Sequence, residues 1–136
     1  MKSIIDGISI KLDDLFGYPI HLDEVKQGLV TPCFFIKPLL STSKDMIDNR
    51  KYRTYGFVII FVPNDEEPIT SQFPEIVDKL FDNFDSIQLS DGTILYTFDR
   101  TIEADEVLEF TVRFKVYLNK EKEAEPLLEH LEMSVI

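Results

Sequence analysis

Residues 108–118, LEFTVRFKVYL, decide the class of fold that this sequence encodes. Leucine, phenylalanine and valine stand at every second position, and the positions between them carry glutamate, threonine, arginine, lysine and tyrosine. A period of two is that of a β-strand with one face toward a core and the other toward water, and such strands are typical of antiparallel sheets. The stretch predicts a long strand in a mostly antiparallel sheet.

The segment just before this strand has the pattern of a β-hairpin. Asp91-Gly92 separates two β-prone runs, residues 86–90 and 93–98. An Asp-Gly pair between two such runs favours a type I′ turn. Because a hairpin joins neighbouring antiparallel strands, we expect the two runs to pair with each other.

Further strands are expected on either side. Residues 54–62, TYGFVIIFV, are apolar on both alternating faces, which predicts a central strand covered on both sides. Residues 33–40, CFFIKPLL, are β-prone, and Pro38 places this run near a sheet edge or a bulge. The polar residues 41–52 predict a loop or the tip of a long hairpin. A last alternation predicts a closing strand with the apolar residues Leu131, Met133 and Val135.

Two stretches have the helical period instead. Apolar residues recur at helical spacing over residues 3–16 and again over residues 71–84. Ser3 is placed to cap the first helix and Gly17 to end it. The two apolar stripes consist of Ile4, Ile5, Ile8, Leu12, Leu15 and Phe16, and of Phe73, Ile76, Val77, Leu80, Phe81 and Phe84.

These elements predict an α+β fold in a single domain over residues 1–136. The length suits one domain with its own core. Helices do not separate successive strands, so a doubly wound βαβ sheet is not expected. We expect a mostly antiparallel sheet of about five to six strands with two helices packed on one face.

The composition excludes several classes of function. Fourteen basic and twenty-five acidic residues give a net charge of −11, and this balance argues against binding of nucleic acid through its phosphates. No apolar run approaches the roughly 20 residues of a membrane-spanning helix, and the start of the chain lacks the pattern of a signal peptide. The sequence therefore predicts a protein of the cytosol, or one that assembles there, without a membrane partner.

The single cysteine is the candidate that an enzyme hypothesis would use. Cys33 lies in VKQGLVTPCFFI, residues 25–36, and a nucleophilic thiol would need a base such as His21 or His130. No neighbouring cation or helix start predicts a lowered thiol pKa, and two phenylalanines follow the cysteine. Since free cysteine packs like a small apolar residue, we expect Cys33 to be buried at the start of a strand.

The sequence gives no pattern of a metal or cofactor site. Residues 82–92 contain several aspartates, but Ile87 and Leu89 occupy positions where a calcium loop needs oxygen ligands. The five glycines are scattered and form no phosphate-binding motif. We therefore predict no catalytic, cofactor-binding or metal-binding residues.

The distribution of charge is the first feature that a generic fold leaves unexplained. Four basic residues, Lys44, Arg50, Lys51 and Arg53, gather in one segment of an otherwise acidic chain. From Asp99 onward the balance reverses, with Glu103, Asp105, Glu106, Glu109, Glu121, Glu123, Glu125, Glu129 and Glu132. One interpretation is solvated turns; the other is a head-to-tail contact in which the basic segment of one copy meets the acidic edge of the next. Unequal patches of this kind suit a ring, and exposed strand edges would be hidden by pairing between subunits.

Several quoted segments carry a resemblance to a known family. MKSIIDGISIKLDDLFG (1–17) runs into YPIHLDEVKQGLVTPCFFI (18–36), and RKYRTYGFVIIFVP (50–63) precedes the second helix. These segments, above all residues 23–28 with residues 32–35, resemble the small tail proteins of phages and prophages of Gram-positive bacteria, of the tail terminator or tail completion type. The resemblance covers residues 1–62 and, beyond them, the order of the elements.

The resemblance implies a structural role in the virion tail, without cofactor or catalysis. Such proteins form rings, typically hexamers, that cap the tail tube and end its polymerisation. They also offer the joint to the head connector, or to the collar of a headless phage-tail-like bacteriocin. The implied partners are further copies of the chain, the tail tube protein, the connector or collar, and the sheath as a further candidate. DNA would only pass through the ring, and assembly would take place in the host bacterial cytoplasm.

Under this hypothesis the subunit interface contains Lys44, Arg50, Lys51 and Arg53. Three other hypotheses stay open at this point. The chain could be a head–tail connector or neck protein of the same particle, a cytosolic α+β binding domain, or a small thiol-dependent enzyme.

Overall fold

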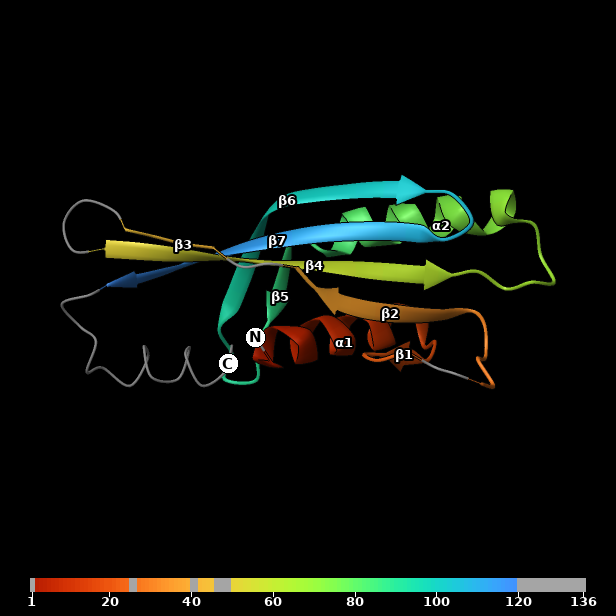
Figure 1. Ribbon diagram of the computed structural model, residues 1–136, viewed down its shortest axis with the longest axis horizontal. Helices are drawn as coiled ribbons and strands as arrows, with labels where there is room; N and C mark the ends of the chain where they lie inside the picture. The colour runs from red at the N-terminus through yellow and green to blue at the C-terminus, as the bar shows by residue number, and fades with distance from the viewer. Residues whose placement is uncertain (1, 25–26, 40–41, 46–49, 120–136) are drawn as a thin grey trace.

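The computed structural model describes residues 2–24, 27–39, 42–45 and 50–119 (Figure 1). Its helices are α1 (Lys2–Phe16) and α2 (Ile69–Asn83). Its strands are β1 (Ile20–His21), β2 (Cys33–Pro38), β3 (Thr42–Asp45), β4 (Arg50–Val62), β5 (Ser86–Gln88), β6 (Ile94–Ala104) and β7 (Leu108–Asn119). The predicted closing strand and His130 lie outside the described residues.

The strands form one sheet in the order β1-β2-β4-β7-β6-β5, and β3 pairs with β4 off this path. All pairs are antiparallel except β1 with β2. The strands β5 and β6 pair as expected, and β6 pairs in addition with β7. The prediction of a mostly antiparallel α+β fold is confirmed.

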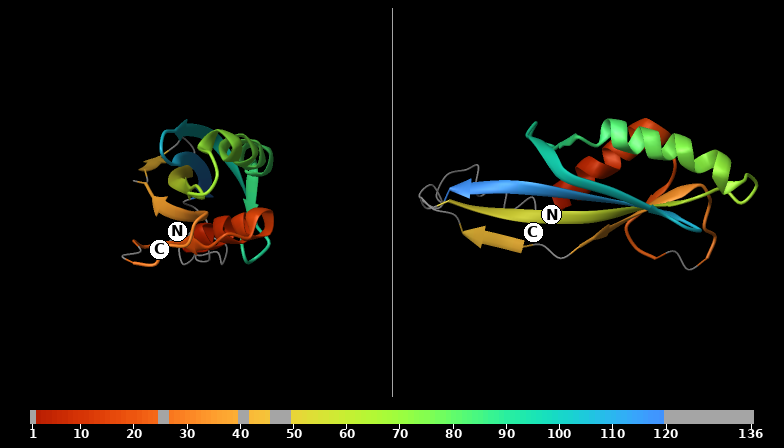
Figure 2. Two further views of the ribbon diagram at one scale, coloured as in Figure 1. Left: turned by 90° about the vertical axis from the view of Figure 1, so that its right-hand side faces the viewer. Right: turned by 90° about the horizontal axis from the view of Figure 1, so that it is seen from above.

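Both helices pack on the same face of the sheet (Figure 2). Fully buried phenylalanines from the strands, such as Phe57 and Phe110, meet Ile8 and Leu12 of α1 and Leu80 of α2 in one apolar cluster. Phe110 contacts Phe84 edge to face, with ring centres 5.7 Å apart. The helical and strand periods in the sequence therefore meet in a common core, as predicted.

The expectation that β4 is covered on both sides was wrong. Tyr55, Phe57 and Phe61 on its helix-facing side are buried, whereas Val58 and Ile60 on the other side are only half-buried. In the part of the chain that the structure describes, no helix covers that second face. The apolar run of β4 arises from its central position between β2 and β7, where neighbouring strands shield both flanks.

Close contacts fix α1 against β5. A Cβ at Gly7 would lie 3.0 Å from the carbonyl oxygen of Gln88, so the helix approaches the strand at a distance that only glycine allows. The Lys11 ammonium donates a hydrogen bond to the carbonyl of Asn83 at 2.6 Å and another to that of Ser86. Burial lowers the Lys11 pKa and outweighs the neighbouring Asp85, which raises it. Lys11 thus joins α1 to the end of α2 and the start of β5.

Two local predictions at the first helix have different outcomes. Gly17 ends α1 as expected, with φ of 71° and its N–H donating to the Asp13 carbonyl at 2.9 Å. Ser3 does not cap the helix, because α1 begins at Lys2 and the Ser3 hydroxyl is buried without a hydrogen-bond partner. A cap residue must precede the first helical turn, and Ser3 already lies inside it.

The turn between β5 and β6 also differs from the prediction. The Gly92 N–H donates to the Leu89 carbonyl at 3.0 Å, and the Leu89 N–H donates to the Thr93 carbonyl at 2.8 Å. These bonds enclose a three-residue loop, residues 90–92, with Gly92 at φ 90°. A type I turn followed by a left-handed glycine fits this pattern, and a two-residue type I′ turn does not.

Candidate functional site

A β-sheet arm projects beyond the helices at one end of the molecule (Figures 1 and 2). We call this part the arm; it consists of β3, residues 50–54 of β4 and residues 115–119 of β7. Thr42 to Asp45 pair with Thr54 to Lys51, and Arg50 to Thr54 pair with Asn119 to Lys115. Of the two alternatives for residues 41–52, the long hairpin is therefore the one supported by the described part of this segment.

The arm carries the four predicted basic residues, and strand alternation divides them between its two faces. Lys44 stands in register with Tyr52, and Arg50 with Asn119, so both positions lie on the arm. Lys51 and Arg53 lie two positions apart on β4 and are half-buried. These residues occupy paired strands rather than the predicted loop or hairpin tip alone.

Sequence reasoning missed a fifth basic residue of the arm. The Lys115 ammonium lies 4.6 Å from the ring centre of Tyr52 and 5.0 Å from that of Phe98. The Tyr52 ring in turn contacts Tyr117, with centres 5.8 Å apart. Cation–π contacts of this kind hold a charge over aromatic faces. Lys115 is sixty-two positions after Arg53 in the chain, so only the pairing of β4 with β7 reveals it.

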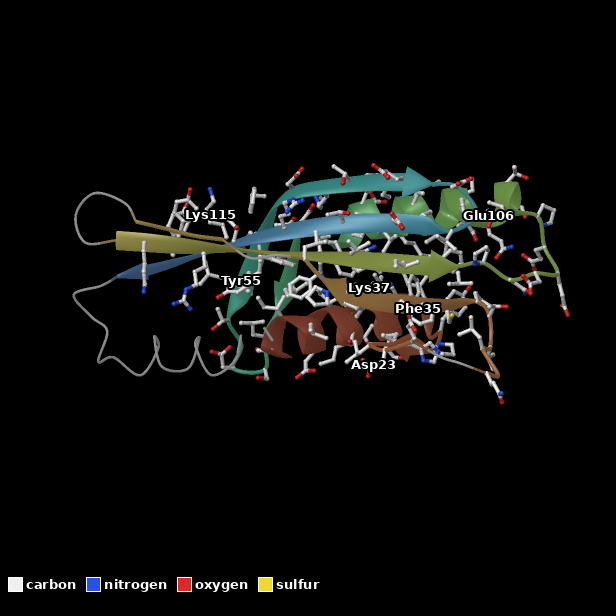
Figure 3. All side chains as sticks on the ribbon, in the orientation of Figure 1. Asp23, Phe35, Lys37, Tyr55, Glu106 and Lys115 are labelled. Carbon is white, nitrogen blue, oxygen red and sulfur yellow. The ribbon has the colours of Figure 1, made fainter. Side chains whose placement is uncertain are left out.

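The opposite end of the sheet is acidic. We call the β6–β7 turn and its flanks the acidic end; its carboxylates, all exposed, are Glu103, Asp105, Glu106 and Glu109. Together with Ala104 and Val107 they line a shallow cavity. Figure 3 shows Lys115 at one end of the molecule and Glu106 at the other. The acidic residues predicted beyond residue 119 lie outside the described part of the chain.

The two ends are too far apart to attract each other within one molecule. Glu109 stands in register with Ile60, nine positions along β4 from Lys51. At about 3.3 Å per residue this separation is roughly 30 Å. Charges in solution are screened over about 8 Å at physiological salt. The arm and the acidic end therefore do not attract each other appreciably within one molecule.

Cys33 is buried, as predicted, but not in the main core. It pairs in register with Val62 and alternates with Phe34, which places it on the sheet face opposite the helices. Burial raises the pKa of the Cys33 thiol above its ordinary value. This is the reverse of what a nucleophilic thiol needs, because the thiolate is the reactive form.

We expect Cys33 to resist a thiol reagent in the folded protein at neutral pH. Burial and the raised pKa both lower the accessible thiolate, so native labelling should take hours, whereas unfolding in denaturant should release one thiol per chain at once. A Ser90→Cys variant, with its thiol on the exposed turn, is the control and should react within minutes. Rapid stoichiometric labelling of native Cys33 would revive the thiol-enzyme hypothesis.

The described residues contain no group of three or more His, Cys, Asp or Glu side chains able to hold a metal ion. None of the described helices is long and apolar enough to cross a membrane. The cavity between α1 and β1, about 570 Å³, is lined by one carboxylate, that of Asp13, together with Tyr18 and small or apolar residues. The strongest functional feature of the described structure is therefore the pair of charged ends.

Comparison with known families decides the class of protein. A family model described as "Phage tail terminator protein" matches residues 3–126, which is most of the chain. The chain belongs to the phage tail terminator family. No curated protein matches it. Tail terminator proteins are structural proteins, so a role in the phage tail and association with other tail components follow from membership, and the sequence resemblance is confirmed.

Proposed function

We propose that this tail terminator protein assembles head to tail into a ring that caps the finished tail tube. The ring ends tube polymerisation and offers the joint to the head connector or collar. Six copies is the number implied by the resemblance. Each chain, residues 1–136, acts as one domain of the ring, and assembly takes place in the host bacterial cytoplasm. Family membership supports the tail role.

The observation that best supports a ring is that basic and acidic residues lie at opposite ends of the sheet. A head-to-tail contact joins two different surfaces of the same chain, and it closes into a ring when the rotation between copies is regular. The arm and the acidic end are such surfaces, since they differ in charge and lie at opposite ends (Figure 3). In this contact the two faces of the arm, with Lys44, Arg50 and Lys115 on one and Lys51 and Arg53 on the other, lie next to the acidic end of the next copy.

The arm itself supports a contact with a partner. Among the described residues it is a single layer of three strands outside the helix-covered core, with Tyr117 61% exposed. Sheets of few strands gain stability by packing a face against another element. A neighbouring copy supplies that element in the ring.

Net charge suits the passage of DNA through such a ring. A chain of −11 repels phosphate groups, so DNA would move through the lumen without being bound. The tail tube protein, the connector or collar, and the sheath of a contractile particle are the proposed further partners.

The ring is tested with the purified full-length chain. We expect light scattering at 0.15 M salt to give a mass of several copies, and negative-stain images to show rings of uniform diameter. Raising the salt to about 1 M should shift the distribution toward single chains, because the Debye length falls to about 3 Å. A single-chain mass at physiological salt and high protein concentration would overturn the proposal.

A further inference from the structure

The outer edge of β3 has no strand partner among the described residues. β3 pairs with residues 51–54 of β4 through one edge, and no described strand pairs with its other edge. An edge strand presents unpaired N–H and C=O groups that can accept a strand from another chain. The arm therefore offers an open hydrogen-bonding edge as well as positive charge.

A second open edge runs along β6 toward the acidic end. β5 pairs only with residues 94–96 of β6, and the Thr97 N–H is bonded to the Asp85 carbonyl at 2.9 Å. Residues 99–104 pair with β7 on one side and with no described strand on the other. The open part of β6 is long enough to accept the four residues of β3.

The two open edges lie on opposite flanks of the sheet. β3 adjoins β4 on the side of β2, whereas β6 lies beyond β7 on the other side. Contact between one flank and the opposite flank of the next copy is heterologous and can be repeated from copy to copy. Contact between two β6 edges would instead give a closed dimer.

Strand directions suit this contact. β3 runs antiparallel to β4, and β4 and β6 both run antiparallel to β7, so β3 and β6 run in opposite directions. Copies that keep the same strand direction around a ring would therefore pair β3 with β6 in antiparallel fashion, the more stable arrangement per residue.

Placing β3 of one copy beside β6 of the next also brings the basic arm close to the acidic end. β3 lies level with residues 115–118 of β7, whereas the open part of β6 is centred on Thr101, level with Thr111. Along the strand direction, β3 and the open part of β6 are therefore offset by about five residues, or roughly 17 Å. When a sheet closes into a ring, its strands tilt, and tilted strands accommodate an offset of this kind. Sliding the arm by this distance places it beside Glu103 of the next copy.

We propose that β3 of each copy pairs antiparallel with residues 99–104 of β6 in the next, so that one continuous sheet runs around the ring. This inference rests on the proposed ring and specifies how its subunits join. Backbone hydrogen bonds supply the pairing, and the charges of the arm and the acidic end select the head-to-tail partner.

Disulfide trapping in a Cys33→Ala background tests the pairing. Thr42 stands in register with Thr54 of β4. Thr101 stands in register with Thr111 of β7, which in turn stands in register with Val58 of β4. Both positions therefore belong to the face of the sheet away from the helices. Thr42→Cys is combined in turn with Asp99→Cys, Thr101→Cys and Glu103→Cys, which covers the neighbouring registers on that face. We expect mild oxidation to give a ladder of covalent oligomers with one of these pairs.

The matched control replaces the next residue of the same strand. Ser43→Cys, combined with the same three β6 cysteines, should give little cross-linking, since successive strand residues point to opposite faces. Rings seen by mass and microscopy without any ladder would overturn the strand pairing while leaving the ring intact. Covalent dimers from Thr101→Cys alone would overturn it in favour of a two-fold contact. Absence of rings before oxidation would overturn the proposed function and the pairing together.

Discussion

Reversing two charges of the arm is expected to leave the protein as single chains. Mixing this variant with one that has two reversed charges at the acidic end is expected to restore assembly. Lys51→Glu with Arg53→Glu leaves the arm with three basic and three acidic residues, Asp45 included, so the arm loses its net positive charge. Glu103→Lys with Glu106→Lys leaves the acidic end with two basic and two acidic residues, so this end loses its net negative charge. Each variant alone loses the attraction between its arm and its acidic end. In a mixture the unchanged arm of one variant meets the unchanged acidic end of the other, and the reversed residues meet each other with opposite charges.

The expected size of the effect follows from ordinary surface ion pairs. Each exposed pair contributes about 0.2–1 kcal/mol, and reversal replaces attraction with repulsion of similar size. Two reversed residues therefore weaken each contact by about 2 kcal/mol, which is roughly thirtyfold in the dissociation constant. The mass of each variant and of the equimolar mixture, measured by light scattering at 0.15 M salt, gives the result.

The charge-conserving variant Lys51→Arg with Arg53→Lys is the control and should assemble like the natural sequence. If the reversed variants assemble as well as the natural sequence, the contact does not depend on these charges. If both stay folded but the mixture remains as single chains, the arm does not meet the acidic end. Circular dichroism of each variant establishes the folded state in both cases.

Phe110→Ala is expected to cause the largest loss of folding stability. Phe110 is fully buried on β7, and its ring meets Phe81 and Phe84 with centres 5.7 Å away in each case. Truncating a buried phenylalanine to alanine removes its apolar burial and leaves a cavity, which costs about 3–5 kcal/mol. Since domains of this size are stable by about 5–15 kcal/mol, the variant would lose a large part of its stability.

Assembly must be kept out of this measurement, because binding to neighbouring copies stabilises the folded chain. Urea unfolding is therefore measured in the Lys51→Glu, Arg53→Glu background. Phe98→Ala is the control: Phe98 is 51% exposed and touches Lys115, so its loss should cost at most about 1 kcal/mol. Equal losses for the two variants would contradict the assignment of the core.

The sequence alone predicted the elements whose signal is local. The strand over residues 108–118 and the helix over residues 3–16 follow from periods of 2 and 3.6, and each period is complete within its own segment. Glycine at position 17 likewise ended a helix for reasons of local backbone conformation. The first segments also carried the resemblance to the family that the comparison confirmed.

The predictions that were wrong concern features that depend on residues distant in the sequence but close in the folded protein. The apolar run of β4 predicted cover on both faces, but whether a helix covers the second face depends on where both helices pack. Ser3 has the side chain of a cap, but α1 begins one residue earlier. Asp91-Gly92 has the composition of a type I′ turn, but the register of β5 with β6 closes a three-residue loop instead.

The basic cluster could be identified from the sequence, but its structural role could not. Four charges between residues 44 and 53 fit solvated turns as well as an interface. β4 pairs along its length with β7, which lies more than fifty residues later in the chain. This pairing extends the sheet beyond the core, so the basic segment becomes part of an arm that also contains Lys115. The same pairing places the acidic end about 30 Å away along the strands. Local periods thus determined the elements of this protein, and pairing between distant segments decided which charged surfaces it offers to another copy.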